Sequence, residues 1–256
     1  MIKATVIDRN WTGPLAPAID AYPDGLVLPV DKPYRWTSAD AVRKYKFALQ
    51  KHFHNRHIKV GHAGTLDPLA TGLLVICAGR ATKIAETLQA GTKEYEATIE
   101  FGATTASYDL EKEIDAIYPH EHITREAVER ALEGFIGEQE QVPPIFSAKM
   151  VGGKRAYELA REGKSVPLSS SLITIERISL DDFKIGDSGR PQADVTIRCS
   201  KGTYIRSFAR DLGLSLGSGA HLTALRRTLS GDFEIKNAIS LDFLLSSNNF
   251  AGSQQK

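Results

Sequence analysis

The chain has little cysteine, no long hydrophobic run and no leader-like start. Cys77 and Cys199 are its only cysteines, and both lie in apolar stretches without CxxC or Cys/His spacing. We therefore expect reduced, buried thiols and no structural zinc. No stretch approaches the roughly 18 apolar residues of a membrane span. Asp8 and Asp20 interrupt the N-terminal segment where a signal peptide is apolar. The expected location is the cytoplasm, with no membrane contact.

Nucleotide-binding and metal-binding motifs are missing as well. The sequence contains no P-loop, no GxGxxG fingerprint and no metal-ligand cluster, so we expect neither a metal nor another cofactor. Heptads and internal repeats are absent, and the one low-complexity tract, residues 246–256, is expected to be disordered. The rest of the chain, 42% hydrophobic and 25% charged overall, has the composition of a globular protein with a sizeable core.

Net charge is only +1 for the 256 residues, but the charges are unevenly distributed. KHFHNRHIKVGH, residues 51–62, contains two Lys, one Arg and four His without an acid. Residues 201–227 contain five Lys or Arg against Asp211 alone, whereas residues 94–140 carry thirteen acids and three bases. Each run alone is typical of solvated surface. Two basic segments in one chain also fit a phosphate-binding face, and this alternative favours nucleic acid as a partner.

Hydrophobic periodicity predicts an α+β fold with a mixed, mostly antiparallel sheet and flanking helices. We expect an N-terminal extension, residues 1–24, then one domain, residues 25–245, with ordered structure beginning near Gly25. The expected strands are GLVLPVDKP, GLLVICAG, KEYEATIEF, SLITIERISLDDF and ADVTIRCS, and the expected helices are ADAVRKYKFALQKHF, ATKIAETLQA, the segment after Thr124, a short basic helix near residue 156 and the segment after Thr203.

Three side chains depart from what a core requires. Asp67 precedes Pro68, which steers it into an extended loop, and small neighbours let a ligand approach; an Asx-type turn cap is the alternative. Arg206 falls in the first turn of a helix that Thr203 is expected to cap. A cation there opposes the helix dipole and needs an anionic partner such as Asp67. Tyr95, on the inward face of its strand, is by default a core tyrosine.

Six segments carry a family resemblance in order and spacing. They are GHAGTLDPLATG, KEYEATI, GATTASYDLE, IFSAKMVGGKRAYELAREG, CSKGTYIRSFARDLG and GSGAHLTALRR. Together, over residues 25–233, the sequence resembles the TruB family of tRNA pseudouridine synthases. The resemblance implies the pseudouridine synthase fold with an inserted RNA-gripping loop, and it makes residues 25–245 a catalytic domain. The accessory C-terminal RNA-binding domain of many members is not expected, since few residues follow Gly231.

The resemblance also implies the chemistry. Family members isomerise a T-loop uridine, at position 55 of tRNA, by flipping the base and attacking with an aspartate. Asp67 matches the nucleophile, Arg206 an arginine that pairs with it, and Tyr95 a tyrosine that stacks on the uracil and relays a proton. The residues that match positions in contact with the RNA are His62, Asp109, Tyr204, Leu225, Lys149, Lys154 and Arg155.

The implied partner is the T-arm of tRNA, bound by a monomer without a guide RNA. A noncatalytic RNA-binding or tRNA-folding factor on the same scaffold remains the alternative, as does a synthase acting on another RNA. Ala106 and Tyr108 depart from residues that are often acidic or hydroxylic in the family, which leaves the contacts around Asp109 open. The extension, residues 1–24, has no family counterpart.

Overall fold

The computed structural model describes residues 3–147, 149–156, 159 and 167–243. The tail expected to be disordered and most of the short basic helix expected near residue 156 lie outside the described residues. The chain divides into two compact units: unit 1 comprises Met1–Lys93 and Arg226–Lys256, and unit 2 comprises Glu94–Leu225. Strand β13, Ala220–Ser230, passes from unit 2 into unit 1.

Unit 1 is built on a mixed sheet around a buried central strand. Its strands are β1 (Thr5–Val6), β2 (Leu26–Lys32), β3 (Val60–His62), β4 (Thr71–Ala78), the end of β13, β14 (Phe233–Glu234) and β15 (Ile239–Ser240). β2 and β3 pair antiparallel with β4, whereas β1 and β15 add to β2 in parallel and the end of β13 adds to β4 in parallel. The apolar run of β4 is buried on both faces, as its sequence predicts.

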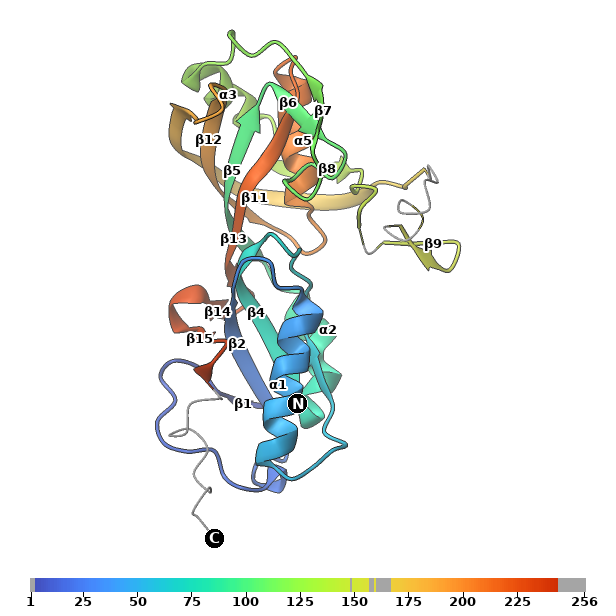
Figure 1. Cartoon of the computed structure of the whole chain (residues 1–256), viewed down its shortest axis with the longest axis vertical. Coiled ribbons are helices and arrows are strands. Elements are labelled where there is room, and N and C mark those ends of the chain that lie inside the picture. The colour runs from blue at the N-terminus through green and yellow to red at the C-terminus, as the bar shows by residue number, and fades with distance from the viewer. Residues whose placement is uncertain (1–2, 148, 157–158, 160–166, 244–256) are drawn as a thin grey trace. The chain divides into compact units, whose positions relative to one another are not determined.

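Helix α1 (Ser38–His52) begins where the sequence places it. The Thr37 hydroxyl accepts a hydrogen bond from the Asp40 amide, while the Asp40 carboxylate accepts one from the Thr37 amide, which completes a capping box. The helix packs on β3 and β4 (Figure 1). The shorter helical elements of unit 1 are η1 (Ile19–Ala21), η2 (Gly79–Ile84), α2 (Ala85–Gln89) and η3 (Ile235–Asn237).

The expected helix ATKIAETLQA is therefore divided into a 3-10 turn and one short α-helix. The Thr82 hydroxyl donates to the Gly79 carbonyl within the 3-10 segment. The β-branched side chains of Thr82 and Ile84 lower helix propensity there. The segment is helical as predicted, but it is not one α-helix.

The N-terminal extension is part of unit 1, so the expectation that ordered structure begins near Gly25 is wrong. β1 pairs with the first residues of β2, and the Ile7 amide donates to the Val27 carbonyl at 2.9 Å. Ile7 and Leu15 are buried, and Tyr22 packs edge-on against Phe53 with ring centroids 6.0 Å apart. Pairing with β2 and burial of apolar side chains together order the extension. Its strand has only two residues, which is too short to show hydrophobic alternation in the sequence.

Unit 2 contains a mainly antiparallel sheet. Its strands are β5 (Lys93–Phe101, beginning at the unit boundary), β8 (Gly137–Gln141), β11 (Ser171–Ile185), β12 (Pro191–Cys199) and the first part of β13. Two separate antiparallel pairs are formed by β6 (Ala103–Thr105) and β7 (Ile114–Ile117), and by β9 (Met150–Val151) and β10 (Lys154–Arg155). β11 pairs antiparallel with both β8 and β12. The five long strands expected from the sequence are all present.

Among the described residues of unit 2, helices α3 (Arg125–Glu133) and α5 (Ile205–Ser215) cover the core. The apolar side chains Ile205, Phe208, Ala209 and Leu212 of α5 are buried, and Phe208 meets Phe135 edge-on with ring centroids 5.1 Å apart. Full burial of each such side chain stabilises the fold by about 1.5–3 kcal/mol. The predicted cap of α5 is wrong: Tyr204 is the N-cap, and the Thr203 hydroxyl donates to the Ser200 carbonyl instead.

The architecture confirms the α+β prediction of a mixed, mostly antiparallel sheet with flanking helices. Cys77 and Cys199 are buried as expected. Burial raises the pKa of the Cys77 thiol to about 11, so this group is a poor nucleophile. Within the part of the chain that is described, no helix is both long and apolar enough to cross a membrane.

Candidate active site

Asp67 lies on the loop between β3 and β4, and the residue before it is fixed to the start of α1. The Ser38 hydroxyl accepts a hydrogen bond from the Leu66 amide at 2.8 Å and donates to the Leu66 carbonyl at 3.0 Å. Leu66 is buried, whereas Asp67 is partly exposed. The backbone before Asp67 is therefore anchored, while Asp67 itself remains partly exposed.

Lys32 anchors the residue that follows Asp67. It is fully buried at the end of β2, and its ammonium donates to the carbonyls of Pro33, Trp36 and Pro68 at 3.1, 2.6 and 3.4 Å. Burial lowers the pKa of Lys32 to about 8, and the negative charge of Asp67 opposes this shift. The ammonium therefore holds the loop and adds positive potential near the carboxylate.

Arg227 anchors the other end of the loop from strand β13. It is 1% exposed, and its guanidinium donates to the carbonyls of Leu73, Gly64 and Thr65 at 2.7, 3.1 and 3.4 Å. Gly72 lets β13 approach β4 this closely, since a Cβ at its φ of +95° would lie 2.4 Å from the Arg227 carbonyl oxygen. Two buried cations thus hold the loop through backbone carbonyls.

His62 ends β3 beside this loop. Its Nδ1 is buried and has no hydrogen-bond partner among the described residues. Burial lowers the pKa of His62, and the charge of Arg227 lowers it further. The imidazole is therefore neutral at pH 7, a state in which a flat ring loses little on stacking against a nucleobase.

In unit 2, Arg206 lies in the first turn of α5 as predicted, and it is almost fully buried. Its Nε lies 3.7 Å from Asp109 Oδ2, and its terminal nitrogens donate to the carbonyls of Ser107 and Phe146 at 3.2 and 2.9 Å. Asp109 accepts from the Ser107 hydroxyl at 2.6 Å and from the Glu111 amide at 3.0 Å. Asp109 is thus an anionic partner of Arg206, as the helix dipole requires, although the sequence suggested Asp67 for this role.

Four further predicted residues of unit 2 lie in described parts of the structure. Tyr95 and Leu225 both pack, partly buried, against the unit 2 core. The backbone of Tyr204 exchanges two hydrogen bonds with the Gln141 side chain, which fixes the approach to α5. The Lys149 ammonium donates to the Ser169 carbonyl at 2.5 Å and to the Ser171 hydroxyl at 3.0 Å.

Lys154 and Arg155 form the second strand of the β9–β10 hairpin, whose turn contains two glycines with positive φ. The hairpin belongs to the segment that resembles the RNA-gripping loop. The side chains of these two residues lie outside the described part of the structure, so their phosphate contacts stay a prediction.

The structure therefore groups Asp67 and His62 with Lys32 and Arg227 in unit 1, and Arg206 with Asp109 in unit 2. Sequence reasoning missed Lys32 and Arg227 as loop anchors. The available signal was a charged residue at the end of an apolar strand, which the alternation rule assigns to the solvent face. Among the described residues, no group of three His, Cys, Asp or Glu side chains is arranged to hold a metal.

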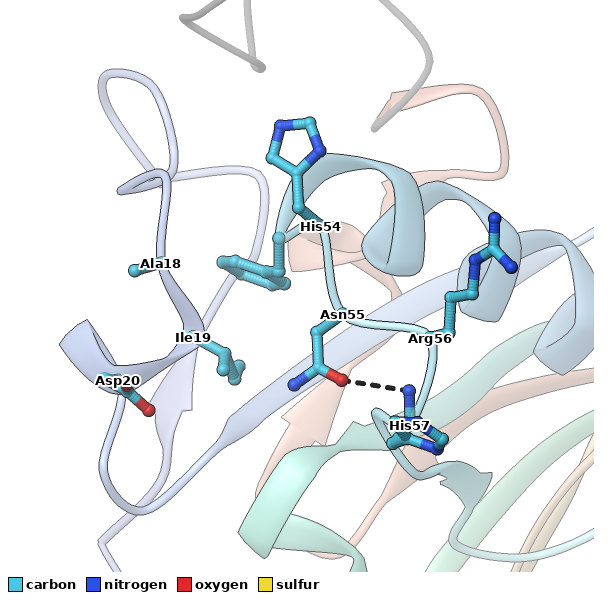
Figure 2. A pocket seen from close by; sticks show the side chains of 8 residues that line it. Ala18, Ile19, Asp20, His54, Asn55, Arg56 and His57 are labelled. Carbon is cyan, nitrogen blue, oxygen red and sulfur yellow. Dashed lines mark hydrogen bonds between the residues drawn. The ribbon is translucent and has the colours of Figure 1, made fainter.

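A pocket of about 500 Å³ lies elsewhere in unit 1, between the extension and the segment after α1 (Figure 2). Asp20 lies on one side, and His54, Arg56 and His57 lie on the other, where the Asn55 side chain accepts from the His57 amide. None of the predicted site residues lines it. Basic side chains at this end of α1 compensate the helix dipole without any ligand.

Comparison with known proteins matches both parts of the chain. Residues 50–205 match the model described as TruB family pseudouridylate synthase (N terminal domain), and residues 206–255 match tRNA pseudouridylate synthase B C-terminal domain. The tRNA pseudouridine synthase B of Phocaeicola vulgatus is 52% identical over 221 residues, 86% of this chain and 92% of the relative. That of Mycobacterium bovis (strain BCG / Pasteur 1173P2) is 49% identical over 86% of this chain and 71% of the relative.

A solved structure agrees in fold. The chain matched in a Cbf5-Nop10-Gar1 complex has a TM-score of 0.63 and 28% identity, over 85% of this chain and 53% of that one. The fold and the matched residues define a pseudouridylate synthase, which is an isomerase. Within this class, the chain belongs to the TruB family. The family resemblance found in the sequence is confirmed.

Proposed function

We propose that this protein isomerises the uridine at position 55, in the T-loop of tRNA, with Asp67 as nucleophile and without a cofactor. The observation that carries the proposal is the Asp67 loop, whose backbone is held by Ser38, Lys32 and Arg227 while the aspartate is left partly exposed. Relatives about half identical over most of their length are tRNA pseudouridine synthases B, which supports tRNA as the substrate.

The chemistry needs a nucleophile and a proton acceptor but no redox step. The Asp67 carboxylate forms a transient covalent bond with the base or the ribose, and the N1–C1′ glycosidic bond breaks. The uracil rotates, C5 bonds to C1′, and the bond to Asp67 breaks, which returns the free carboxylate. The C5 hydrogen leaves as a proton, and N1 gains a proton. In this scheme Arg206 pairs with Asp67 and orients its carboxylate, and Tyr95 stacks on the uracil and relays the proton.

The uridine must leave its stack before it reacts, which costs a few kcal/mol. His62 fills the vacated position, because its partly buried, neutral ring suits stacking. Asp109, Tyr204 and Leu225 support or contact the flipped nucleotide. Lys149, Lys154 and Arg155 bind phosphate in this scheme, and Lys149 must then exchange its present partners Ser169 and Ser171 for RNA.

The proposal includes the partners and the domain boundaries expected from the sequence. Residues 25–245 of both units contribute to catalysis, and the protein acts in the cytoplasm as a monomer on the T-arm, without a guide RNA. The experiment is incubation of the purified protein alone with an unmodified tRNA transcript, followed by carbodiimide modification and primer extension to map pseudouridine. A transcript with cytidine at position 55 is the matched control.

One pseudouridine at position 55, absent from the cytidine transcript, is the expected result. A pseudouridine elsewhere would overturn the position but keep the reaction. Tight tRNA binding with no pseudouridine in any of several transcripts would replace the enzyme with the RNA-binding alternative.

A further inference from the structure

The turn between β2 and α1 presents two exposed side chains outside the candidate active site. Tyr34 and Arg35 form its tip, and Tyr34 is 47% exposed. Arg35 has a φ of 64°, and only two other non-glycine residues in the described part of the chain have a positive φ. Glycine adopts this conformation without steric cost, so a Cβ-bearing residue here is disfavoured by the backbone.

The charge of Arg35 is available to a ligand. Its guanidinium lies over the Tyr34 ring, 5.5 Å from the centroid, and forms no ion pair with any carboxylate of the described residues. By contrast, Arg43 pairs with Asp40 at 2.6 Å and Arg226 pairs with Asp31 at 2.7 Å. A guanidinium held on an aromatic face is partly ordered before binding, which lowers the entropic cost of a new contact.

The turn is tied to the proposed catalytic loop by one group. The buried Lys32 ammonium donates to the carbonyls of Pro33 and Trp36, on either side of the tip, and also to the carbonyl of Pro68. Pro68 directly follows Asp67, so a single ammonium group fixes both backbones. The turn and the Asp67 loop are therefore neighbours within unit 1.

We propose that Arg35 binds a backbone phosphate of the RNA next to the nucleotide that reacts at Asp67, with Tyr34 holding the guanidinium in place. A planar cation with several donors matches a phosphate, and this contact explains why a strained position carries arginine where glycine fits the backbone. The inference rests on the proposed function, because it requires RNA at the Asp67 loop.

Arg35→Gly tests the charge of the residue separately from its effect on the backbone. It removes the charge and relieves the strained φ, while it adds freedom to the unfolded chain, so the melting temperature should change by less than about 2 °C. Affinity for a T-arm hairpin should fall about 3- to 10-fold at roughly 0.1 M salt. The slope of log affinity against log salt should become shallower by about 0.7–0.9. Fluorescence anisotropy over a salt series measures both quantities.

Two controls make the result specific. Arg35→Lys keeps a cation in the same backbone and should keep the wild-type salt slope. Arg9→Ala removes an exposed arginine from the extension and should leave affinity and slope unchanged. Wild-type affinity and slope in Arg35→Gly, with the wild type still binding and isomerising tRNA, would overturn this inference alone. A wild type that neither binds nor isomerises tRNA would overturn the proposed function, and this inference with it.

Discussion

At the scale of single residues, Lys32 and Arg227 are buried cations whose hydrogen bonds go to backbone carbonyls. Burying a charge is costly unless its donors are satisfied. Here the donors are satisfied by backbone carbonyls, and one from Lys32 and two from Arg227 go to the loop that carries Asp67. Both cations therefore order this loop, and under the proposed function they position Asp67.

Replacing Arg227 tests this account. Arg227→Met keeps the side-chain volume roughly but leaves the Gly64, Thr65 and Leu73 carbonyls without their donor. We expect the free energy of unfolding to fall by about 2–4 kcal/mol in urea denaturation. Arg43→Met, at an exposed i,i+3 ion pair, should cost less than about 0.5 kcal/mol. Equal losses in the two variants would contradict the anchoring role.

The lowered pKa of Lys32 predicts a pH effect of known sign. Between pH 8, its folded pKa, and 10.5, its ordinary value, the unfolded chain holds the proton and the folded chain does not. Stability therefore rises with pH in this window, by up to about 3 kcal/mol, as the cost of the buried charge is relieved. Lys32→Met should lack this rise when urea denaturation is compared at pH 7.5 and 10. Parallel profiles for the variant and the wild type would refute the assignment.

Some of these residues were predictable and others were not. Asp67, Tyr95 and Arg206 emerged from local rules and were assigned roles by the family resemblance. Asp109 was named as a nucleotide contact, but its ion pair with Arg206 joins segments almost a hundred residues apart, which no local pattern encodes. Lys32 escaped notice because strand alternation describes faces, not the buried end of a strand.

At the scale of elements, long periodic segments were predicted well and short ones were not. α1, β4 and β12 have the expected type because capping and burial period are local properties of their sequences. The helix after β4 was predicted as one element but is divided, and Thr203 was predicted as a cap but bonds backward to Ser200. Where a helix begins, ends or is divided depends on contacts with residues distant in the sequence.

The extension provides a prediction at this scale. Ile7 is fully buried just after β1, and its neighbour Val6, the last residue of β1, is 40% exposed. Ile7→Ala should lower the free energy of unfolding by about 2–4 kcal/mol, since it removes buried methyl groups and leaves a cavity. Val6→Ala should cost well under half as much in the same urea titration. Similar small losses in both would mean that the extension contributes little to the fold.

At the scale of the whole molecule, the fold changes the interpretation of the basic segments. In residues 201–227, Arg206 and Arg227 are buried, Arg226 pairs with Asp31, and Arg210 pairs with Asp211. Most of the basic side chains of that segment are therefore buried or paired with carboxylates of the protein itself. The first segment, residues 51–62, keeps its Lys and Arg side chains exposed. Phosphate binding is thus expected from the first segment and from Arg35, and only to a small extent from the second.

Asp67 is the proposed nucleophile of a tRNA pseudouridine synthase. Tritium release from a tRNA transcript labelled at uridine C5 tests this role directly, since bond formation at C5 expels that hydrogen. Wild type and the control Asp20→Asn, which alters an exposed acid of the extension, should each release about one equivalent per tRNA. Asp67→Asn should release none while retaining its fold and its tRNA binding. Equal release by Asp67→Asn and wild type would contradict the account.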